Sequence, residues 1–377
     1  MRADGVRSSP CSLGMGKAAR ARLSPVTCME SNNPHGRETD SREDKVTPVA
    51  PAMSSFHIIV FSFNRAMQCE SVLRSIRERV KTPRLTVSVV WRATGSHLDG
   101  YRQLRGMYEA QGVRFFEQAG AIGFFRHVLP LLWMPRNLYH WLKFDYVRKA
   151  DNFKPLLEQV IAETPDDFVA FNTDDNLYYR DELLPDAAFR LILADPYGSS
   201  YRVIQGANLA DCPAVAQREP GFLQWDYYAS EAQSSWTYPF SVDGQFFERQ
   251  ALLSVIRRVL YHNPVTLESY TVGYVRRKRL FRCGHSPVHA SMMALALNKV
   301  SFVVPQNTRG NLPPARLNEL FLKGYTLEYE APERLAVREV IPKEIVVVRA
   351  GKRLVLPLSP DEEGKPPVHA EHQSAKI

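Results

Sequence analysis

The adjacent carboxylates of Asp174 and Asp175 lie in the segment NTDDN at 172–176. This segment follows the apolar run at 168–171, which is typical of a buried strand. Carboxylates at the end of a buried strand are costly to desolvate unless a cation or hydrogen-bond donors compensate their charge. Open α/β sheets also bind their ligands at such strand ends. We therefore expect a divalent-metal site that holds a diphosphate.

The elements that must position this pair alternate between strand and helix. Apolar residues recur at strand or helix spacing in each of them, and glycine, proline or polar residues separate them. Strands are predicted at 56–61, 85–91, 113–116, 168–171, 201–205 and 300–304, and helices at 69–80, 98–108, 153–161, 183–193 and 247–259. This alternation predicts an α/β fold, with a mostly parallel sheet flanked by helices on both faces in a single domain.

The loop after the first predicted strand excludes two common nucleotide sites. The strand runs into SFNR at 62–65, which contains neither the G-x-G-x-x-G of a dinucleotide site nor the G-x-x-x-x-G-K-[ST] of a P-loop. A nucleotide-sugar sheet remains, in which the first loop holds the nucleoside and a later aspartate turn holds metal and diphosphate. Mg²⁺ or Mn²⁺ would bridge carboxylate and phosphate oxygens there and offset charge on the leaving nucleoside diphosphate.

Several segments together resemble a known family. The segment FSFNRAMQ at 61–68 resembles the opening of family-2-like glycosyltransferases with the GT-A fold, and NTDDN resembles their D-x-D-type turn. Further segments are similar to a bacterial group of such transferases: VSVVWRAT at 87–94, YPFSVDGQFF at 238–247, NPVTLE at 263–268 and LNELFLKGY at 317–325. The resemblance covers about residues 56 to 330.

The resemblance implies a donor site built from the first two strand ends. Ser62, Asn64 and Arg65 would contact the nucleoside and its ribose or phosphate, and Arg92 would lie within reach of the donor. The partner implied is a nucleotide-diphosphate sugar. Unlike many enzymes of this fold, the second strand ends without an acidic residue that would hold the base.

The resemblance also implies a metal cofactor, Mn²⁺ or Mg²⁺, at the aspartate turn. Asp174 and Asp175 would contact the metal and orient the donor sugar, and Asp175 is favoured for direct ligation. A histidine nearer the C-terminus often completes the metal shell in this family. His285 and His289 are the nominal candidates.

The acceptor would be a carbohydrate or another hydroxyl compound. Asp243 is the leading candidate for the general base that deprotonates this hydroxyl, and Glu268 is the second. The aromatic residues Trp225, Trp236 and Tyr238 could stack on sugar faces, because the C–H surface of a pyranose suits an apolar platform with a polar rim.

Each assignment has a structural alternative. Asp243 could cap the helix that follows it, and Glu268 could bind backbone amides or an arginine. Arg65 could form a surface ion pair. The aromatic residues at 225–238 could pack in the core, and the basic run at 276–279 could be either a solvated face or a contact for anionic lipid or polysaccharide.

Two other functions remain open. A sugar-phosphate nucleotidyltransferase uses a similar sheet but would need a glycine-rich first loop, which SFNR is not. A non-catalytic carbohydrate-binding relative would keep the fold without metal-dependent nucleotide binding. A nucleic-acid partner is not expected, because the basic residues are dispersed and no recognition motif occurs.

Composition places the chain among ordinary globular proteins with a basic balance. It has 377 residues, 45% of them hydrophobic, and a formal net charge of +8, which suits a polyanionic partner. Its five cysteines are scattered and odd in number, which favours a reducing compartment. We therefore predict a cytoplasmic protein, with peripheral membrane contact as an option. The apolar segment at 121–133 is interrupted by charged residues and proline, so it is interpreted as a buried helix with its loop.

The sequence predicts three regions. Residues 1–54 are rich in serine, proline and charge, and read as a disordered extension. Residues 55–340 form the glycosyltransferase-like domain, with a nucleotide-binding half at about 55–180 and an acceptor half at about 181–340. Residues 341–377 are predicted to contain a strand segment and a loose tail.

Overall fold

The first strand, β1 (Phe56–Phe63), lies inside the main sheet and leads into the predicted nucleotide loop. Its first seven residues are buried. Two parallel neighbours pair with it, β2 (Leu85–Arg92) on one side and β4 (Phe168–Thr173) on the other. Because all three strands run in one direction, the loops that follow β1, β2 and β4 meet at the same edge of the sheet.

The computed structural model describes residues 54–118, 152–229, 235–298, 310–329 and 335–358. All of these residues belong to one compact unit. The predicted N-terminal extension up to residue 53, the apolar segment at 121–133, the predicted strand at 300–304 and the predicted tail beyond residue 358 lie outside the described residues.

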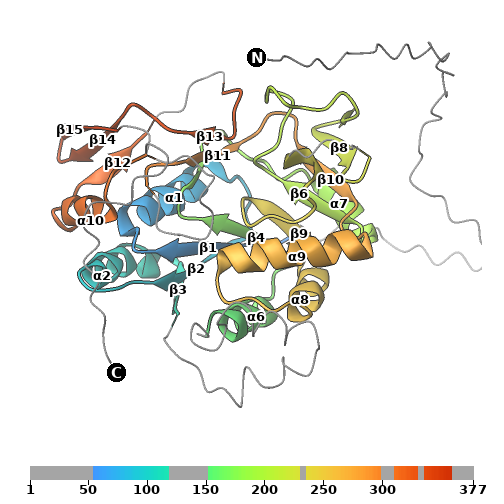
Figure 1. Ribbon diagram of the computed structural model, residues 1–377, viewed down its shortest axis with the longest axis horizontal. Helices are drawn as coiled ribbons and strands as arrows, with labels where there is room; N and C mark the ends of the chain where they lie inside the picture. The colour runs from blue at the N-terminus through green and yellow to red at the C-terminus, as the bar shows by residue number, and fades with distance from the viewer. Residues whose placement is uncertain (1–53, 119–151, 230–234, 299–309, 330–334, 359–377) are drawn as a thin grey trace, which may run out of the picture. The chain divides into compact units, whose positions relative to one another are not determined.

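The main sheet has nine strands. Six extend it beyond the central three: β3 (Arg114–Glu117), β6 (Ser199–Arg202), β7 (Gln217–Glu219), β8 (Phe222–Asp226), β9 (Gln245–Glu248) and β10 (Cys283–Pro287). The order across the sheet is β3-β2-β1-β4-β9-β6-β10-β8-β7 (Figure 1). The pairings leave only β9 and β8 antiparallel to the other seven. The predicted α/β fold with a mostly parallel sheet is confirmed.

Helices cover both faces of this sheet because alternate strand residues point to opposite sides. Ile58 and Val60 belong to one apolar cluster, whereas Ile59 and Phe61 belong to the other. The first cluster includes residues of α1 (Ala66–Arg79), α2 (His97–Tyr108), α7 (Asp186–Ala194) and α10 (Pro314–Leu322). The second includes residues of α6 (Phe153–Glu163), α8 (Arg249–Arg257) and α9 (Pro264–Lys278) (Figure 1).

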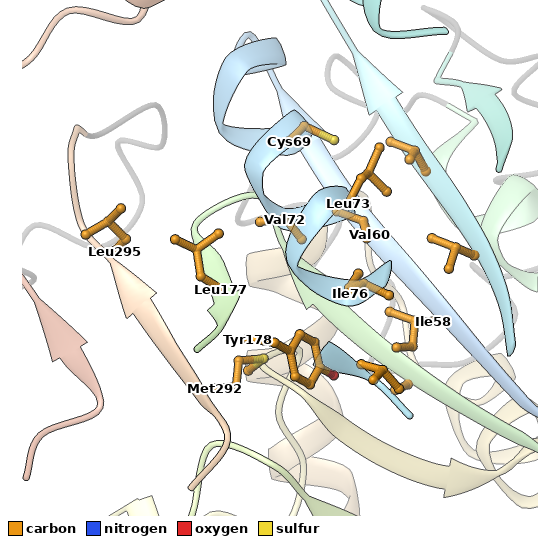
Figure 2. Packing of buried hydrophobic residues seen from close by; sticks show 14 of the residues in the cluster. Ile58, Val60, Cys69, Val72, Leu73, Ile76, Leu177, Tyr178, Met292 and Leu295 are labelled. Atoms are coloured by element: carbon orange, nitrogen blue, oxygen red, sulfur yellow. The ribbon is translucent and has the colours of Figure 1, made fainter. Parts of the chain in front are cut away.

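Two small sheets complete the described fold. One pairs β11 (Met292–Leu295) with β5 (Asn176–Tyr178) and β13 (Glu339–Val340), and the other joins β12 (Thr326–Glu328), β14 (Glu344–Arg349) and β15 (Lys352–Pro357). Figure 2 shows the buried side chains Leu177 and Tyr178 of β5 with their neighbours on α1 and β11. The chain therefore passes from the main sheet to a small sheet directly after the aspartate pair.

Two elements have boundaries that differ from the predicted ones. The predicted helix at 247–259 begins at Arg249, because the Glu248 carboxylate caps it by accepting from the amides of Gln250 (2.9 Å) and Ala251 (2.6 Å). Phe247 lies instead in β9, and the strand predicted at 201–205 ends at Arg202. The helix α9 was not predicted.

Phe189 of α7 offers a direct test of the packing between helix and sheet. Its ring is fully buried and meets the rings of Phe56 (4.7 Å) and Phe168 (4.8 Å) edge-on. We expect Phe189→Ala to lower the free energy of unfolding by about 3–5 kcal/mol, through lost burial and the cavity left behind. Leu191→Ala, on the exposed side of the same helix, should cost less than about 1 kcal/mol. Urea unfolding of both variants measures the difference, and equal losses would contradict this packing.

Candidate functional site

The aspartate pair lies in the turn between β4 and β5. Asp174 is buried, whereas 15% of the Asp175 side chain is exposed. The Leu295 amide donates to the Asp175 carbonyl (2.7 Å) and fixes the turn on the side of the small sheet. On the other side, Phe61 of β1 is in register with Thr173 of β4. The loop that follows β1 therefore reaches the aspartates.

Asp174 is held by three donors from the end of β1 and the loop that follows it. Its Oδ2 accepts hydrogen bonds from the Ser62 hydroxyl (2.9 Å) and the Phe63 amide (3.2 Å). Its Oδ1 accepts from the Arg65 guanidinium (2.8 Å). Burial raises the pKa of Asp174, and the positive charge of Arg65 opposes this effect. Both carboxylate oxygens are thus used to join two strand ends.

Arg65 binds both aspartates at once. Its Nη1 also reaches Asp175 Oδ2 (3.2 Å), and its Nη2 donates to the Asn298 carbonyl (2.5 Å). Burial alone would lower the pKa of Arg65, but Asp174 and Asp175 raise it above its ordinary value, so the guanidinium stays charged. The surface ion pair considered for Arg65 is wrong, because its side chain is only 6% exposed. Its predicted contact with the nucleotide stays a prediction.

Asn64 gives the β1 loop its shape. It adopts the left-handed backbone conformation (φ 56°), which asparagine tolerates better than most residues. Its side chain accepts a hydrogen bond from the backbone amide of Thr94 (2.9 Å) and donates one to the Thr94 hydroxyl (3.0 Å). The backbone amide of Asn64 donates to the Arg92 carbonyl (3.2 Å). The ends of β1 and β2 are therefore joined, with the exposed Arg92 at the same edge.

Asp243 approaches the turn from the start of β9. Its Oδ1 accepts from the Thr173 hydroxyl (3.1 Å) and from the Asn176 side-chain amide (2.7 Å). The Thr173 hydroxyl also lies 2.8 Å from Asp175 Oδ1, so one threonine connects the two acids. Burial and the nearby charge of Asp175 raise the pKa of Asp243. Asp243 does not cap α8, because Glu248 does.

Glu268 lies on α9 beside the Asp243 loop. Its Oε1 accepts from the Ser241 hydroxyl (2.8 Å) and the Val242 amide (3.2 Å), so the backbone contact considered for it does occur. Burial, with the charge of Asp243 as the second cause, raises the pKa of Glu268 to about 7. A carboxyl group with this pKa is suited to exchanging protons near neutral pH.

Two of the three predicted acceptor aromatics pack inside the protein. Trp225 and Trp236 are buried, with their rings in an edge contact at 4.7 Å. The Trp225 indole N–H donates to the Trp236 carbonyl (2.9 Å). This is the core packing considered as their alternative, and their placement gives no support to stacking on a sugar. Tyr238 is only partly buried, and burial followed by the charge of Glu268 raises its pKa.

The acid groups fit a divalent cation that shares its ligands with a substrate. In the described residues, no group of three or more His, Cys, Asp or Glu side chains is placed to hold a metal. His285 is buried in β10 against Phe222, and His289 is exposed. Mg²⁺ is usually held by one or two carboxylates, with phosphate and water supplying the other ligands. The partly exposed Asp175 satisfies that requirement.

Sequence reasoning missed two residues of this site. Tyr101 of α2 lies 2.5 Å from the Ser62 hydroxyl and accepts from the Arg65 amide (3.2 Å). Arg202 ends β6 close enough to Asp243 and Glu268 to affect their pKa values. Arg202 could have been found from the sequence, because a charged residue at the end of a buried strand often belongs to a ligand site. The Tyr101 contact has no local signal, because its spacing on α2 is that of a core residue.

A pocket of about 360 Å³ lies elsewhere, between α1, β5 and β12. Arg74 and Arg79 line it, but each already pairs with a carboxylate, Glu70 and Asp181 respectively. This pocket contains none of the predicted site residues. The acid cluster at the ends of β1 and β4 therefore remains the candidate site.

Comparison with known proteins gives a weak likeness to glycosyltransferase structures. No family profile matches the chain, and no curated protein matches its sequence. S. aureus TarS 1-349 is 15% identical over 64% of this chain and 60% of its own, with a TM-score of 0.38. The complex of TarS 1-349 with UDP-GlcNAc is 15% identical over 67% of this chain and 62% of its own, with a TM-score of 0.37. The mannosyltransferase PcManGT from Pyrobaculum calidifontis, in complex with GDP-Man and Mn²⁺, is 17% identical over 44% of this chain and 40% of its own, with a TM-score of 0.26. The chain thus spans less than two thirds of the length of these structures.

The buried ion pair predicts a strong asymmetry between two variants. Arg65→Met leaves Asp174 buried without its cation, so we expect the free energy of unfolding to fall by about 3–5 kcal/mol. Adding Asp174→Asn removes the uncompensated charge and should restore part of that loss. Chemical denaturation of the single and double variants measures the coupling. Equal stability of the two variants would contradict a charged pair.

The raised pKa of Glu268 predicts a pH-dependent stability. Its folded-state pKa (about 7) lies above the ordinary value of 4.5, so its contribution is complete below pH 4.5 and is lost as pH rises through 7. In the wild type, the free energy of unfolding should fall by an amount on the order of 3 kcal/mol as pH rises through this window, and Glu268→Gln should not show this fall. Exposed Glu163→Gln is the control and should keep the wild-type slope. Thermal unfolding between pH 4 and 8 makes the comparison, and an unchanged slope in Glu268→Gln would refute the assignment.

Proposed function

We propose that this chain is a glycosyltransferase that moves a sugar from a nucleotide-diphosphate sugar to an acceptor hydroxyl with the help of a divalent metal. One observation carries the proposal. The loop after β1, the aspartate turn after β4 and the Asp243 loop before β9 meet at one edge of the main sheet. Ligands of open α/β sheets bind at the carboxyl ends of the strands.

The donor would lie over the ends of β1, β2 and β4. Ser62, Asn64 and Arg92 border this edge, and Arg65 holds the aspartate turn in place. Asp175 would hold Mn²⁺ or Mg²⁺ together with the diphosphate oxygens, while Asp174 fixes the turn. The bound metal would offset negative charge on the departing nucleoside diphosphate.

The acceptor would approach Asp243 and Glu268. Asp243 would accept the proton of the acceptor hydroxyl while the oxygen of that hydroxyl bonds to the anomeric carbon of the donor sugar. The bond between that carbon and the diphosphate oxygen breaks, and its electrons leave with the nucleoside diphosphate. Thr173 and Asn176 hold Asp243 through its Oδ1, which orients the carboxylate. Glu268 is the second candidate for the base, because its raised pKa is close to neutral.

Cellular location is a separate proposal. Among the described residues, no helix has the length and apolar character needed to cross a bilayer. We propose a cytoplasmic enzyme, with the basic run at 276–279 as the candidate for peripheral membrane contact.

Two variants separate donor binding from proton transfer. With a panel of nucleotide-sugars that includes UDP-GlcNAc and GDP-Man, we expect Mn²⁺-dependent release of nucleoside diphosphate from one donor. Asp175→Asn should abolish the metal-dependent part of donor binding. Asp243→Asn should lower the transfer rate by about 10²–10⁴ because the general base is lost. Exposed Asp181→Asn is the matched control and should behave as wild type.

Equilibrium dialysis with and without EDTA measures donor binding, and chromatography of the released nucleotide measures turnover. Full activity in Asp175→Asn, or no nucleotide-sugar bound in the presence of Mn²⁺, would refute the proposed function.

A further inference from the structure

Two arginines flank the short segment that leads to Tyr238. Arg202, at the end of β6, donates from Nη1 to the carbonyl of Ser235, which begins η3 (Ser235–Thr237), at 3.0 Å. Arg276 of α9 donates from Nη2 to the Thr237 carbonyl (2.9 Å), and its guanidinium lies 5.7 Å from the centre of the Tyr238 ring. The two cations therefore bind carbonyls of one short segment from different elements.

Arg202 has unused binding capacity. It is 5% exposed, and its buried Nε has no acceptor among the described residues. It also forms no ion pair within 4 Å with any described carboxylate. A buried donor without a partner is costly. The carboxylates of Asp243 and Glu268 are near enough for Arg202 to affect their pKa values, but neither forms a direct ion pair with it. An anionic ligand would supply both the acceptor and the counter-charge.

The arginines lie next to the groups proposed for proton transfer. Tyr238 lies within the electrostatic range of Glu268, Arg202, Asp243 and Arg276. Asp243 in turn interacts with Asp175, the proposed metal ligand. The strand pairing agrees with this order, because Arg202 is in register with Gln245, two residues after Asp243. The site thus runs from Asp175 on the proposed donor side, through Asp243 and Glu268, to the two arginines.

We propose that Arg202 and Arg276 form an oxyanion subsite for the acceptor, which would carry a phosphate or carboxylate group near the hydroxyl that is glycosylated. The inference rests on the proposed function and adds the chemical class of its second substrate. The guanidinium fork suits the paired oxygens of phosphate and carboxylate. The exposed Lys278 and Arg279 extend the positive potential along the end of α9.

Calorimetry on the full chain with three matched compounds tests the subsite. Glycerol, glycerate and glycerol 1-phosphate share a three-carbon frame and differ in the oxyanion. With Mn²⁺ and saturating nucleoside diphosphate filling the donor side, we expect one or both anions to bind at least about 10-fold more tightly than glycerol, as hydrogen bonds to charged groups allow. The stronger of the two identifies phosphate or carboxylate as the preferred group.

Arg276→Gln should reduce this preference by about 10-fold, because one guanidinium is lost. Arg277→Gln is the control, since Arg277 lies one position away and stands over Tyr274 instead. If Arg202→Gln folds, it should reduce the preference as Arg276→Gln does. If the buried substitution prevents folding, the variant at the exposed Arg276 still decides the test. Equal binding of glycerol and both anions, or equal effects of Arg276→Gln and Arg277→Gln, would overturn the proposal.

The two proposals fail differently. If no nucleoside diphosphate binds with Mn²⁺, the proposed function fails. The same titration without nucleotide then still tests the subsite through its dependence on Arg276. If nucleotide binds and the anion preference is missing, only the acceptor class is wrong.

Discussion

The site depends on the buried ion pair between Arg65 and Asp174. A buried ion pair stabilises a fold only when its geometry is good and its remaining hydrogen-bonding groups are satisfied. Here, Ser62 and Phe63 satisfy the second oxygen of Asp174, and the Asn298 carbonyl takes a further N–H of Arg65. The buried Nε of Arg65 has no acceptor among the described residues. Three segments that are distant in sequence therefore meet at one point.

This arrangement leaves the neighbouring aspartate available for chemistry. Both aspartates have protein partners on both oxygens, but only 5% of the Asp174 side chain is exposed, against 15% for Asp175. Asp175 is also the one linked through Thr173 to Asp243. The two aspartates look equivalent in sequence, but one anchors the turn and the other faces the remaining acids.

The proposed acceptor side contains two acids that lack a direct ion pair with a cation among the described residues. Burial raises the pKa values of Asp243 and Glu268. The charge of Asp175 adds to this effect at Asp243, and the charge of Asp243 adds to it at Glu268, while the charge of Arg202 offsets only part of it. Such a cluster is unfavourable for stability but suited to moving protons. In the proposed mechanism, a metal held by Asp175 would lower the cost of a charged Asp243 and so couple donor binding to the protonation of the proposed base.

Much of the fold could be predicted, because its central strands are short apolar runs separated by helices of clear periodicity. The turn at Asp174 was found for the same reason. Phe247 was placed in a helix because its apolar neighbours fit either period, and the antiparallel pairing of β9 is a tertiary contact. The helix α9 was missed although Asn263 and Thr266 form a capping box, since its apolar stripe is short. The partners of Arg65 and the burial of Trp225 are equally long-range, so no local pattern encodes them.

A crystal structure with Mn²⁺ and a nucleoside diphosphate, measured at a wavelength where manganese scatters anomalously, tests the central claim most directly. The account predicts an anomalous peak within direct coordination distance of an Asp175 oxygen and of the diphosphate. It also predicts that Arg65 remains bound to Asp174. A diphosphate bound away from the ends of β1 and β4, or a peak with no contact to Asp175, would contradict it.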